Sequence, residues 1–276
     1  MSTWINGRKG TRIDCRDRGL QYGDGVFETM RVRRGRVRLL EYHLERLYAG
    51  CRRLGIAGPA EEVLRRELAR IAALRSEGVL KLIVTRGTSS QRGYRPTGRE
   101  RCTRILALHP LPRAVLAAAP APAPVRVRVC ATPLGLNPRL AGLKTLNRLE
   151  SVVARAEWHD ARIWEGLMRD AGENIVCGTM SNLFLRRGSN LMTPLLDRCG
   201  VAGVMRRWIL ETASGLGLTP VERRIRWRDL SKAEEVFMSN AVVGIRSVGR
   251  IERGRERLRY RGFGTADRLR RLLDLL

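Results

Sequence analysis

The hydrophobic and polar positions of the chain repeat with both helical and strand-like periods. Apolar side chains recur at helical spacing from residue 40 to residue 54, where Gly55 ends the pattern, and again over residues 60–75. Residues 79–87 and 103–110 have strand character. Residues 125–130 alternate valine with arginine, which predicts a strand with its valines facing inward.

The second half of the chain continues this mixture. We predict a helix over residues 202–214, an amphipathic helix at the C-terminus and short strands before each of them. We also predict a helix over residues 145–159, whose buried stripe consists of Leu146, Leu149, Val153 and Ala156. Helices and strands that intermix in this way indicate an α/β (α+β) fold.

An alanine- and proline-rich segment separates two parts of the sequence. Prolines at this density do not continue a helix, so the segment has the character of a linker. We expect an N-terminal domain of residues 1–115, a linker of residues 116–124 and a C-terminal domain of residues 125–276. A chain of 276 residues is long enough to form two domains of this kind.

The composition is strongly basic, with a formal net charge of +26. The arginines are spread along the whole chain without a DNA- or RNA-binding motif. We therefore expect an anionic small-molecule substrate and no nucleic-acid partner. No apolar run reaches the length of a membrane span, and the N-terminus lacks a secretory pattern, so a cytoplasmic protein without membrane contact is expected. The six cysteines lack metal-ligand spacing and predict reduced thiols and no metal site.

Lysine is scarce in this basic chain. The 53 basic residues include only four lysines, which are Lys9, Lys81, Lys144 and Lys232. Among cationic side chains, lysine alone loses its proton readily and forms a Schiff base with a carbonyl group. Lys144 precedes a segment with a helical pattern of apolar residues. For an isolated lysine at such a place, an ordinary charge at the start of a helix is the favoured interpretation, and a Schiff-base lysine is the alternative.

Six motifs in order give the chain a family resemblance. They are RGLQYGDGVFETMRV, LEYHLERL, LAGLKTLNRLE, GTMSNLF, GVAGVMR and EVFMSNAVVGI. With them the sequence resembles the fold-type IV family of pyridoxal-phosphate enzymes over nearly its whole length. The family comprises branched-chain aminotransferases, D-amino-acid aminotransferases and aminodeoxychorismate lyases. LKTLNRLE and the RGY of residues 92–94 favour the lyase branch.

The resemblance implies a fold and a cofactor. It implies a small N-terminal α/β domain, a larger C-terminal pseudo-barrel domain and a homodimer. Lys144 would hold pyridoxal 5'-phosphate as a Schiff base and then act as the proton-transfer base. The other implied cofactor-binding residues are Arg46, Val204, Met205, Asn240 and Ala241, all on the phosphate side, with the position of Cys177 at the pyridine ring. Tyr94 and Arg95 are the candidates for binding a substrate carboxylate.

Cys177 departs from the family pattern. The resemblance places a glutamate at this position, where it would pair with the ring nitrogen of the cofactor. Glu173 lies four residues upstream, and four residues of strand span roughly 13 Å, which is too far to reach the same nitrogen. A thiol is a weak donor that leaves the ring nitrogen largely neutral, unless it ionises to a thiolate. This favours an elimination that yields an aromatic product over transamination.

The resemblance therefore implies an aminodeoxychorismate lyase, which releases pyruvate and forms 4-aminobenzoate for folate biosynthesis. Within the enzymes, the alternative is an aminotransferase acting on branched-chain or D-amino acids. A cofactor-binding paralogue without turnover, or with altered chemistry because of Cys177, and a basic nucleic-acid-binding protein on the same scaffold are the alternatives from other classes.

Overall fold

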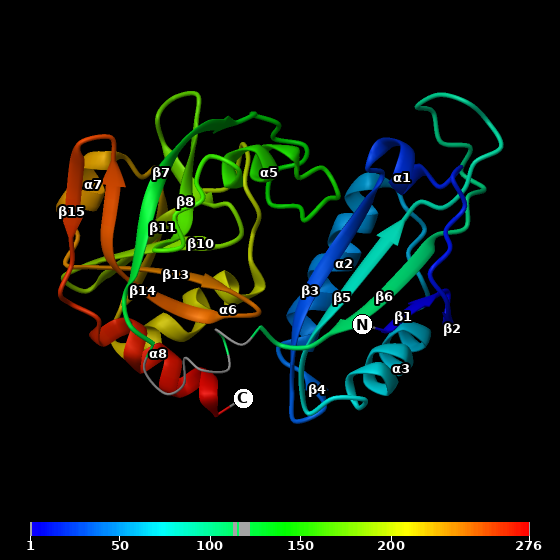
Figure 1. Ribbon diagram of the computed structural model, residues 1–276, viewed down its shortest axis with the longest axis horizontal. Coiled ribbons are helices and arrows are strands. Elements are labelled where there is room, and N and C mark those ends of the chain that lie inside the picture. The colour runs from blue at the N-terminus through cyan, green and yellow to red at the C-terminus, as the bar shows by residue number, and fades with distance from the viewer. Residues whose placement is uncertain (1, 113–114, 116–121, 276) are drawn as a thin grey trace. The chain divides into compact units, whose positions relative to one another are not determined.

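The chain divides into two compact units, which are drawn in Figure 1. The computed structural model describes residues 2–112, 115 and 122–275. The first unit comprises Met1–Arg113 and Leu143–Asn147, and the second comprises Ala114–Gly142 and Arg148–Leu276. Residues 116–121 of the predicted linker lie outside the described residues, and the predicted domain limits stay a prediction. The sequence pattern did not predict that Leu143–Asn147, which follows the linker, packs with the first unit.

A six-stranded antiparallel sheet forms the centre of the first unit. Its strand order is β2-β1-β6-β5-β3-β4, so the long strand β5 lies between β3 and β6. The strands predicted over residues 79–87 and 103–110 are confirmed as β5 and β6. The strands are β1 (Ser2–Ile5), β2 (Arg8–Lys9), β3 (Gly25–Arg33), β4 (Arg36–Val37), β5 (Glu77–Thr85) and β6 (Thr103–His109).

Two amphipathic helices cover one face of this sheet. They are α2 (Leu40–Leu54) and α3 (Glu61–Ala72), and both helix predictions are confirmed. Gly55 ends α2 in the left-handed conformation, with φ 62°. Burying one such leucine stabilises the unit by about 1.5–3 kcal/mol. The core contains Met30, Leu80, Leu82 and Leu106 from the sheet and Leu44, Leu47, Leu64 and Leu68 from the helices.

The second unit is a nine-stranded sheet that curls on itself. The order of its main path is β12-β11-β10-β13-β14-β7-β8-β9, and β15 pairs with β14. The N–H of Ile175 in β9 donates to the carbonyl of Ile225, just after β12, over 2.7 Å. Because this bond joins the two ends of the sheet, the predicted pseudo-barrel and mixed α/β class are confirmed. The strands are β7 (Val125–Leu134), β8 (Ile163–Asp170), β9 (Ile175–Gly178), β10 (Asn182–Arg187), β11 (Asn190–Pro194), β12 (Thr219–Arg223), β13 (Glu235–Asn240), β14 (Gly244–Arg253) and β15 (Glu256–Arg259).

The interior of the curled sheet is apolar. Val127 and Val129 of β7 are buried in it, so the predicted alternation of inward valines and outward arginines is confirmed. The predicted helices over residues 202–214 and at the C-terminus are confirmed as α6 and α8. The helical segments are α5 (Leu149–Arg155), α6 (Val204–Ala213), the 3-10 turn η1 (Ser214–Leu216), α7 (Trp227–Ser231) and α8 (Gly264–Asp274), and in the first unit α1 (Arg18–Tyr22).

The helix predicted over residues 145–159 is wrong at its start and in its buried face. The helix observed, α5, begins at Leu149, and Leu149 and Val153 are 78% and 56% exposed. Residues 144–146 are extended and pair with the edge of β3. The backbone groups of residues 144–146 form hydrogen bonds with that edge instead of the hydrogen bonds of the first turn of the predicted helix.

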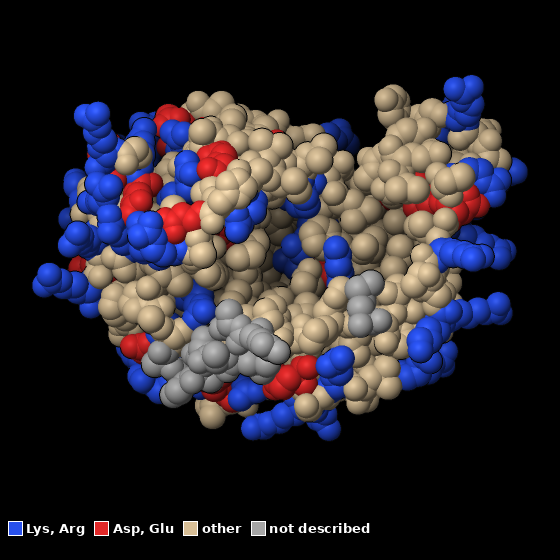
Figure 2. Space-filling model, viewed as in Figure 1, with Lys and Arg blue, Asp and Glu red and all other residues tan. Residues whose placement is uncertain are grey.

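The basic side chains do not gather on one unit. On the face drawn in Figure 2, lysines and arginines occur over both parts of the molecule. Many of the arginines are paired with carboxylates, as Arg104 is with Glu67 and Arg126 with Glu252. Among the described helices, none is both long and apolar enough to cross a membrane.

Candidate active site

Lys144 is held at the edge of β3 in the first unit. The N–H of Phe27 donates to the Lys144 carbonyl over 3.0 Å, and the N–H of Leu146 donates to the Gly25 carbonyl over 3.0 Å. Its ammonium nitrogen lies 4.1 Å from the centroid of the Phe27 ring, a cation–π contact. A Cβ at Gly25 would lie 2.6 Å from the Val84 carbonyl oxygen, so only glycine fits here. The edge pairing fixes the Lys144 backbone and directs its side chain along the Phe27 ring.

A buried cluster of charged and polar groups lies on the neighbouring part of the unit. Arg46 of α2 grips the carboxylate of Glu28 with two hydrogen bonds, from Nε over 2.8 Å and from Nη2 over 2.5 Å. The same carboxylate contacts Nδ1 of His43 over 2.6 Å. The positive charge of Lys144 is close enough to His43 to contribute to lowering the pKa of the imidazole, so Lys144 lies near this cluster.

The protonation states in this cluster follow from burial and charge. Burial lowers the pKa of His43, which leaves the imidazole neutral at pH 7. Burial alone would raise the pKa of Glu28, but the positive charge of Arg46, together with His43 and the hydrogen bonds that both residues make to the carboxylate, outweighs it and holds the pKa at about 2. Nε2 of His43 has no hydrogen-bond partner in the described part of the chain. The cluster therefore contains an ionised carboxylate that fixes the direction of the Arg46 guanidinium.

In the second unit, Val204 and Met205 open helix α6. Gly203 is the N-cap, and no side chain of the described residues caps the helix. The first backbone N–H groups of an α-helix lack intrahelical partners and carry a partial positive charge, which suits an anion. Asn182 places this end by donating from Nδ2 to the Val201 carbonyl over 2.9 Å. A Cβ at Gly203 would lie 2.1 Å from the Asn182 side-chain oxygen, so the close approach requires glycine.

Asn240 and Ala241 form a tight turn after β13. The side-chain oxygen of Asn240 accepts hydrogen bonds from the N–H groups of Val242 and Val243, over 3.0 and 2.8 Å. This arrangement fixes the turn from within and leaves its shape independent of solvent. Asn182 at the start of β10 and Ser239 of β13 are directly paired in the sheet. The turn at Asn240, the next residue of β13, therefore begins beside the start of β10.

A fully buried carboxylate organises the turn of residues 178–181, which follows Cys177. Glu165 of β8 accepts hydrogen bonds from the N–H and hydroxyl of Thr179, over 3.2 and 2.5 Å. It also accepts from the Met180 N–H over 3.2 Å and from the Ser181 hydroxyl over 2.7 Å. All of these donors are neutral. A Cβ at Gly178 would lie 2.8 Å from the Glu165 carboxyl carbon, so the chain passes directly over this group.

Cys177 lies on β9 opposite Met168, and its side chain is 8% exposed. Burial raises the pKa of its thiol to about 12, although the positive charge of Arg148 acts in the opposite direction. The thiol is therefore protonated at pH 7 and carries no charge.

Glu173 occupies an exposed turn and does not accompany Cys177. It has φ 63°, and its carboxylate pairs with Arg169 and, over 3.1 Å, with Arg253. Its role is a surface ion pair.

Tyr94 and Arg95 lie in the loop of residues 88–102 of the first unit, between β5 and β6. Both side chains are exposed, Tyr94 at 84%. The Tyr94 ring contacts Tyr22 at the end of α1, with 5.4 Å between the ring centroids. No contact of the described residues tests whether these two side chains bind a substrate, so their role stays a prediction.

Comparison with known proteins identifies the family of the chain. The model of amino-transferase class IV matches residues 25–251. An aminodeoxychorismate lyase from Vibrio harveyi is 33% identical over 249 residues, which cover 90% of each chain. The chain belongs to the amino-transferase class IV family. The resemblance inferred from the six motifs is thereby confirmed.

Solved structures agree with this membership of the class IV family. The crystal structure of 4-amino-4-deoxychorismate lyase from Pseudomonas aeruginosa is 45% identical, with a TM-score of 0.88, and the match covers 98% of this chain and 97% of that one. A hypothetical aminotransferase from Mycobacterium tuberculosis, solved in a PLP-bound form, is 21% identical with a TM-score of 0.85, covering 99% and 98%. The latter likeness concerns the fold alone.

Several buried residues near the predicted site residues of each unit were missed in the sequence. Glu28 and His43 lie inside the motifs that carry the resemblance, but of this cluster a role was predicted only for Arg46. Glu165 had no assigned role at all. The sequence signal that could have found them is a charged residue between apolar strand residues. Because an unpaired carboxylate is costly to bury, a glutamate at such a position is expected to have hydrogen-bond or ion-pair partners. For Glu165 the pattern Trp-Glu-Gly within an apolar strand carried that signal.

Proposed function

We propose that this class IV protein is a pyridoxal-phosphate-dependent 4-amino-4-deoxychorismate lyase, which releases pyruvate and forms 4-aminobenzoate for folate biosynthesis. We further propose that it acts in the cytoplasm as a homodimer. The observation that carries the proposal is the 45% identity with a 4-amino-4-deoxychorismate lyase over 98% of this chain. The relative from Vibrio harveyi, which has the same activity in its name, supports it.

The described residues fit pyridoxal phosphate. Lys144 is fixed at the β3 edge and can hold the cofactor covalently. Val204 and Met205 present an uncapped helix N-terminus, and the turn at Asn240 and Ala241 offers further backbone groups for a phosphate. Arg46 adds a guanidinium whose direction is set by Glu28. The bound cofactor supplies an electron sink for the electron pair left behind when a substrate C–H bond loses its proton.

The reaction needs one base and one leaving group. The ring carbon that bears the amino group loses a proton, the bond to the enolpyruvyl oxygen breaks, and the ring becomes aromatic. The Lys144 amine is the group we assign to take this proton at Nζ. Tyr94 and Arg95 are the groups we assign to a substrate carboxylate, which is consistent with the exposed position of their loop.

The neutral Cys177 thiol favours elimination in this proposal. A carboxylate at the same position would stabilise a positive charge on a ring nitrogen, whereas a thiol with a pKa of about 12 offers no negative charge at pH 7. Transamination depends on a deep electron sink. Elimination depends on it less, because aromatisation of the product supplies driving force.

The second candidate is an aminotransferase, as the description of the matching family model indicates. The arrangement around Lys144 serves both reactions, so the product distinguishes them. The test is to incubate the pure holoenzyme with aminodeoxychorismate and measure pyruvate and 4-aminobenzoate. The lyase releases the two in equal amounts, and Lys144→Ala releases neither. Amino-group transfer to a 2-oxo acid without pyruvate release would support the aminotransferase instead.

A further inference from the structure

Arg18 lies at the start of α1 and is almost completely buried, with 3% of its surface exposed. It connects three separate parts of the first unit. Its Nε donates to the Asp24 carboxylate over 2.9 Å, Nη1 donates to the Gly93 carbonyl over 3.0 Å, and Nη2 donates to the Tyr94 carbonyl over 2.7 Å. A buried guanidinium is thus held by one carboxylate and two backbone carbonyls of the loop of residues 88–102.

The loop depends strongly on this one side chain. Among the described residues, the hydrogen bonds that reach residues 89–99 from outside residues 88–102 come from Arg18. The other bonds in this stretch are internal, such as those from the N–H groups of Thr97 and Gly98 to Glu100. The contact between the Tyr22 and Tyr94 rings adds apolar support, and the Arg18 guanidinium lies 4.9 Å from the Tyr22 ring centroid.

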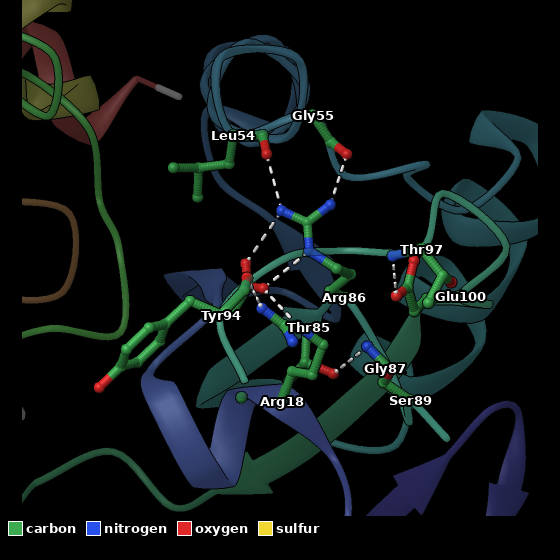
Figure 3. A network of polar contacts seen from close by, with 12 residues as sticks. Arg18, Leu54, Gly55, Thr85, Arg86, Gly87, Ser89, Tyr94, Thr97 and Glu100 are labelled. Atoms are coloured by element: carbon green, nitrogen blue, oxygen red, sulfur yellow. Dashed lines mark hydrogen bonds and ion pairs between the residues drawn. The ribbon is translucent and has the colours of Figure 1, made fainter. Parts of the chain in front are cut away.

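Asp24 fixes the direction of Arg18 and is itself anchored. Arg86 donates to its carboxylate from Nε over 2.7 Å and from Nη2 over 3.1 Å. Arg86 also binds the carbonyls of Leu54 and Gly55 at the end of α2 over 2.7 and 2.6 Å. Figure 3 shows this network, with the Tyr94 ring pointing away from the two arginines. The carbonyl of Tyr94 is held while its side chain projects outward.

We propose that Arg18 is a positioning residue that holds the backbone at Gly93 and Tyr94 and thereby sets where Tyr94 and Arg95 meet a substrate carboxylate. The inference rests on the proposed function, because Tyr94 and Arg95 are the proposed substrate contacts. A planar guanidinium reaches Asp24 and both carbonyls at once. A lysine ammonium is a point charge on a single nitrogen and does not span the three acceptors.

Hydrogen exchange of the protein, without substrate, tests the loop-holding part. In Arg18→Lys, backbone amides of residues 89–99 should exchange on the order of tenfold faster, while amides of β3 and β5 keep their wild-type rates. Asp24→Asn, which retains Arg18 but removes the charge that orients it, should give a smaller increase. Arg12→Ala removes an exposed arginine of the same segment and serves as the matched control, with wild-type exchange expected.

Steady-state kinetics of pyruvate release test the substrate part. Arg18→Lys should raise KM for aminodeoxychorismate on the order of tenfold, the loss expected for one well-placed charge-assisted contact, with kcat changed less than KM. Absorbance of the bound cofactor should be unchanged. Wild-type exchange in Arg18→Lys would overturn the proposal, and so would faster loop exchange with an unaltered KM. If the wild-type protein released no pyruvate, the proposed function would fail, while the exchange result would still decide the role of Arg18.

Discussion

Each unit contains a buried glutamate, and the two are stabilised in different ways. Glu28 of the first unit is 1% exposed and is held by the charged Arg46 and by His43. Glu165 of the second unit is 0% exposed and is held by backbone N–H groups and hydroxyls. A charged partner stabilises a buried carboxylate through one strong interaction, whereas neutral donors do so only in number.

The difference teaches what each carboxylate does for its surroundings. Because Glu28 binds a side chain, it sets the direction of the Arg46 guanidinium. Because Glu165 binds the backbone, it sets the path of the turn after Cys177. In the first unit the buried carboxylate is thus paired with a charged side chain, and in the second the buried carboxylate is held by neutral donors alone.

Replacing Lys144 should remove the chemistry altogether. Lys144→Ala is expected to lose the visible absorbance of the bound cofactor and at least about a thousandfold of the turnover, because the base is gone. Lys81→Ala is the matched control, since Lys81 also lies over the Phe27 ring, 5.6 Å from its centroid. The measurements are absorbance spectra and pyruvate release. Equal losses in the two variants would show that the Phe27 environment, rather than Lys144 itself, is required.

Replacing Glu28 should destabilise the first unit by breaking a buried ion pair. Glu28→Gln removes the negative charge from the pair with Arg46 and should cost about 3–5 kcal/mol of unfolding free energy. The double variant Glu28→Leu with Arg46→Met removes both partners and should recover most of this loss. Among the described residues, no charged side chain is paired with Glu165, so Glu165→Leu has no second substitution that compensates it. Denaturant unfolding measures all three, and failure of the double variant to recover stability would contradict the contrast.

Low pH should act on Glu28 in a defined direction. Its pKa is held at about 2, below its ordinary value of 4.5. The stability contributed by this group is therefore fully present above pH 4.5 and is lost as the pH falls from 4.5 toward 2. The wild-type protein should lose more unfolding free energy over this interval than Glu28→Gln does. Parallel pH dependences in urea unfolding experiments would contradict the assignment.

Replacing Arg46 should weaken cofactor binding. Arg46→Ala should cost about 1.5–3 kcal/mol of affinity for pyridoxal phosphate, roughly ten- to a hundredfold, because one charge-assisted contact to a phosphate is lost. Titration of the apoprotein measures this. Arg52→Ala removes an exposed arginine from the same helix and should bind like wild type. Unchanged affinity in Arg46→Ala would leave Arg46 only its structural pairing with Glu28.

Introducing a charge at Cys177 should shift the balance of reactions. Cys177→Glu should raise transamination of an amino-acid donor relative to pyruvate release, whatever happens to total activity. The added volume can itself cost about 1–3 kcal/mol in a packed site, so cofactor occupancy is checked by absorbance. Cys177→Ser, which adds no charge, is the control. An unchanged or lower ratio in the fully loaded glutamate variant would reject the electronic role of position 177.

The sequence predicted the features that depend on local pattern. Helix α2 and its end at Gly55 followed from the spacing of Leu44, Leu47 and Cys51 with a glycine after them. Lys144 and the order of the six motifs identified the family. Each of these signals is carried by a short stretch of residues, so it can be recognised in a single sequence.

The remaining features depend on partners far apart in the sequence. The apolar residues after Lys144 satisfy a helical pattern, yet residues 144–146 pair with β3, more than a hundred positions earlier. Glu165 meets its donors at residues 179–181, and Arg18 meets its acceptors at Gly93 and Tyr94. Whether a charged side chain can be buried depends on such distant partners. The spacing of apolar residues along the sequence contains no information about them.

The position of the covalent link between protein and cofactor shows whether the edge of β3 presents Lys144 to the cofactor. Borohydride reduction of the wild-type holoenzyme, followed by peptide mapping, locates that link at a single lysine. We expect a pyridoxyl group on Lys144. A group on Lys81, the other lysine over Phe27, or on Lys9 or Lys232 would contradict it.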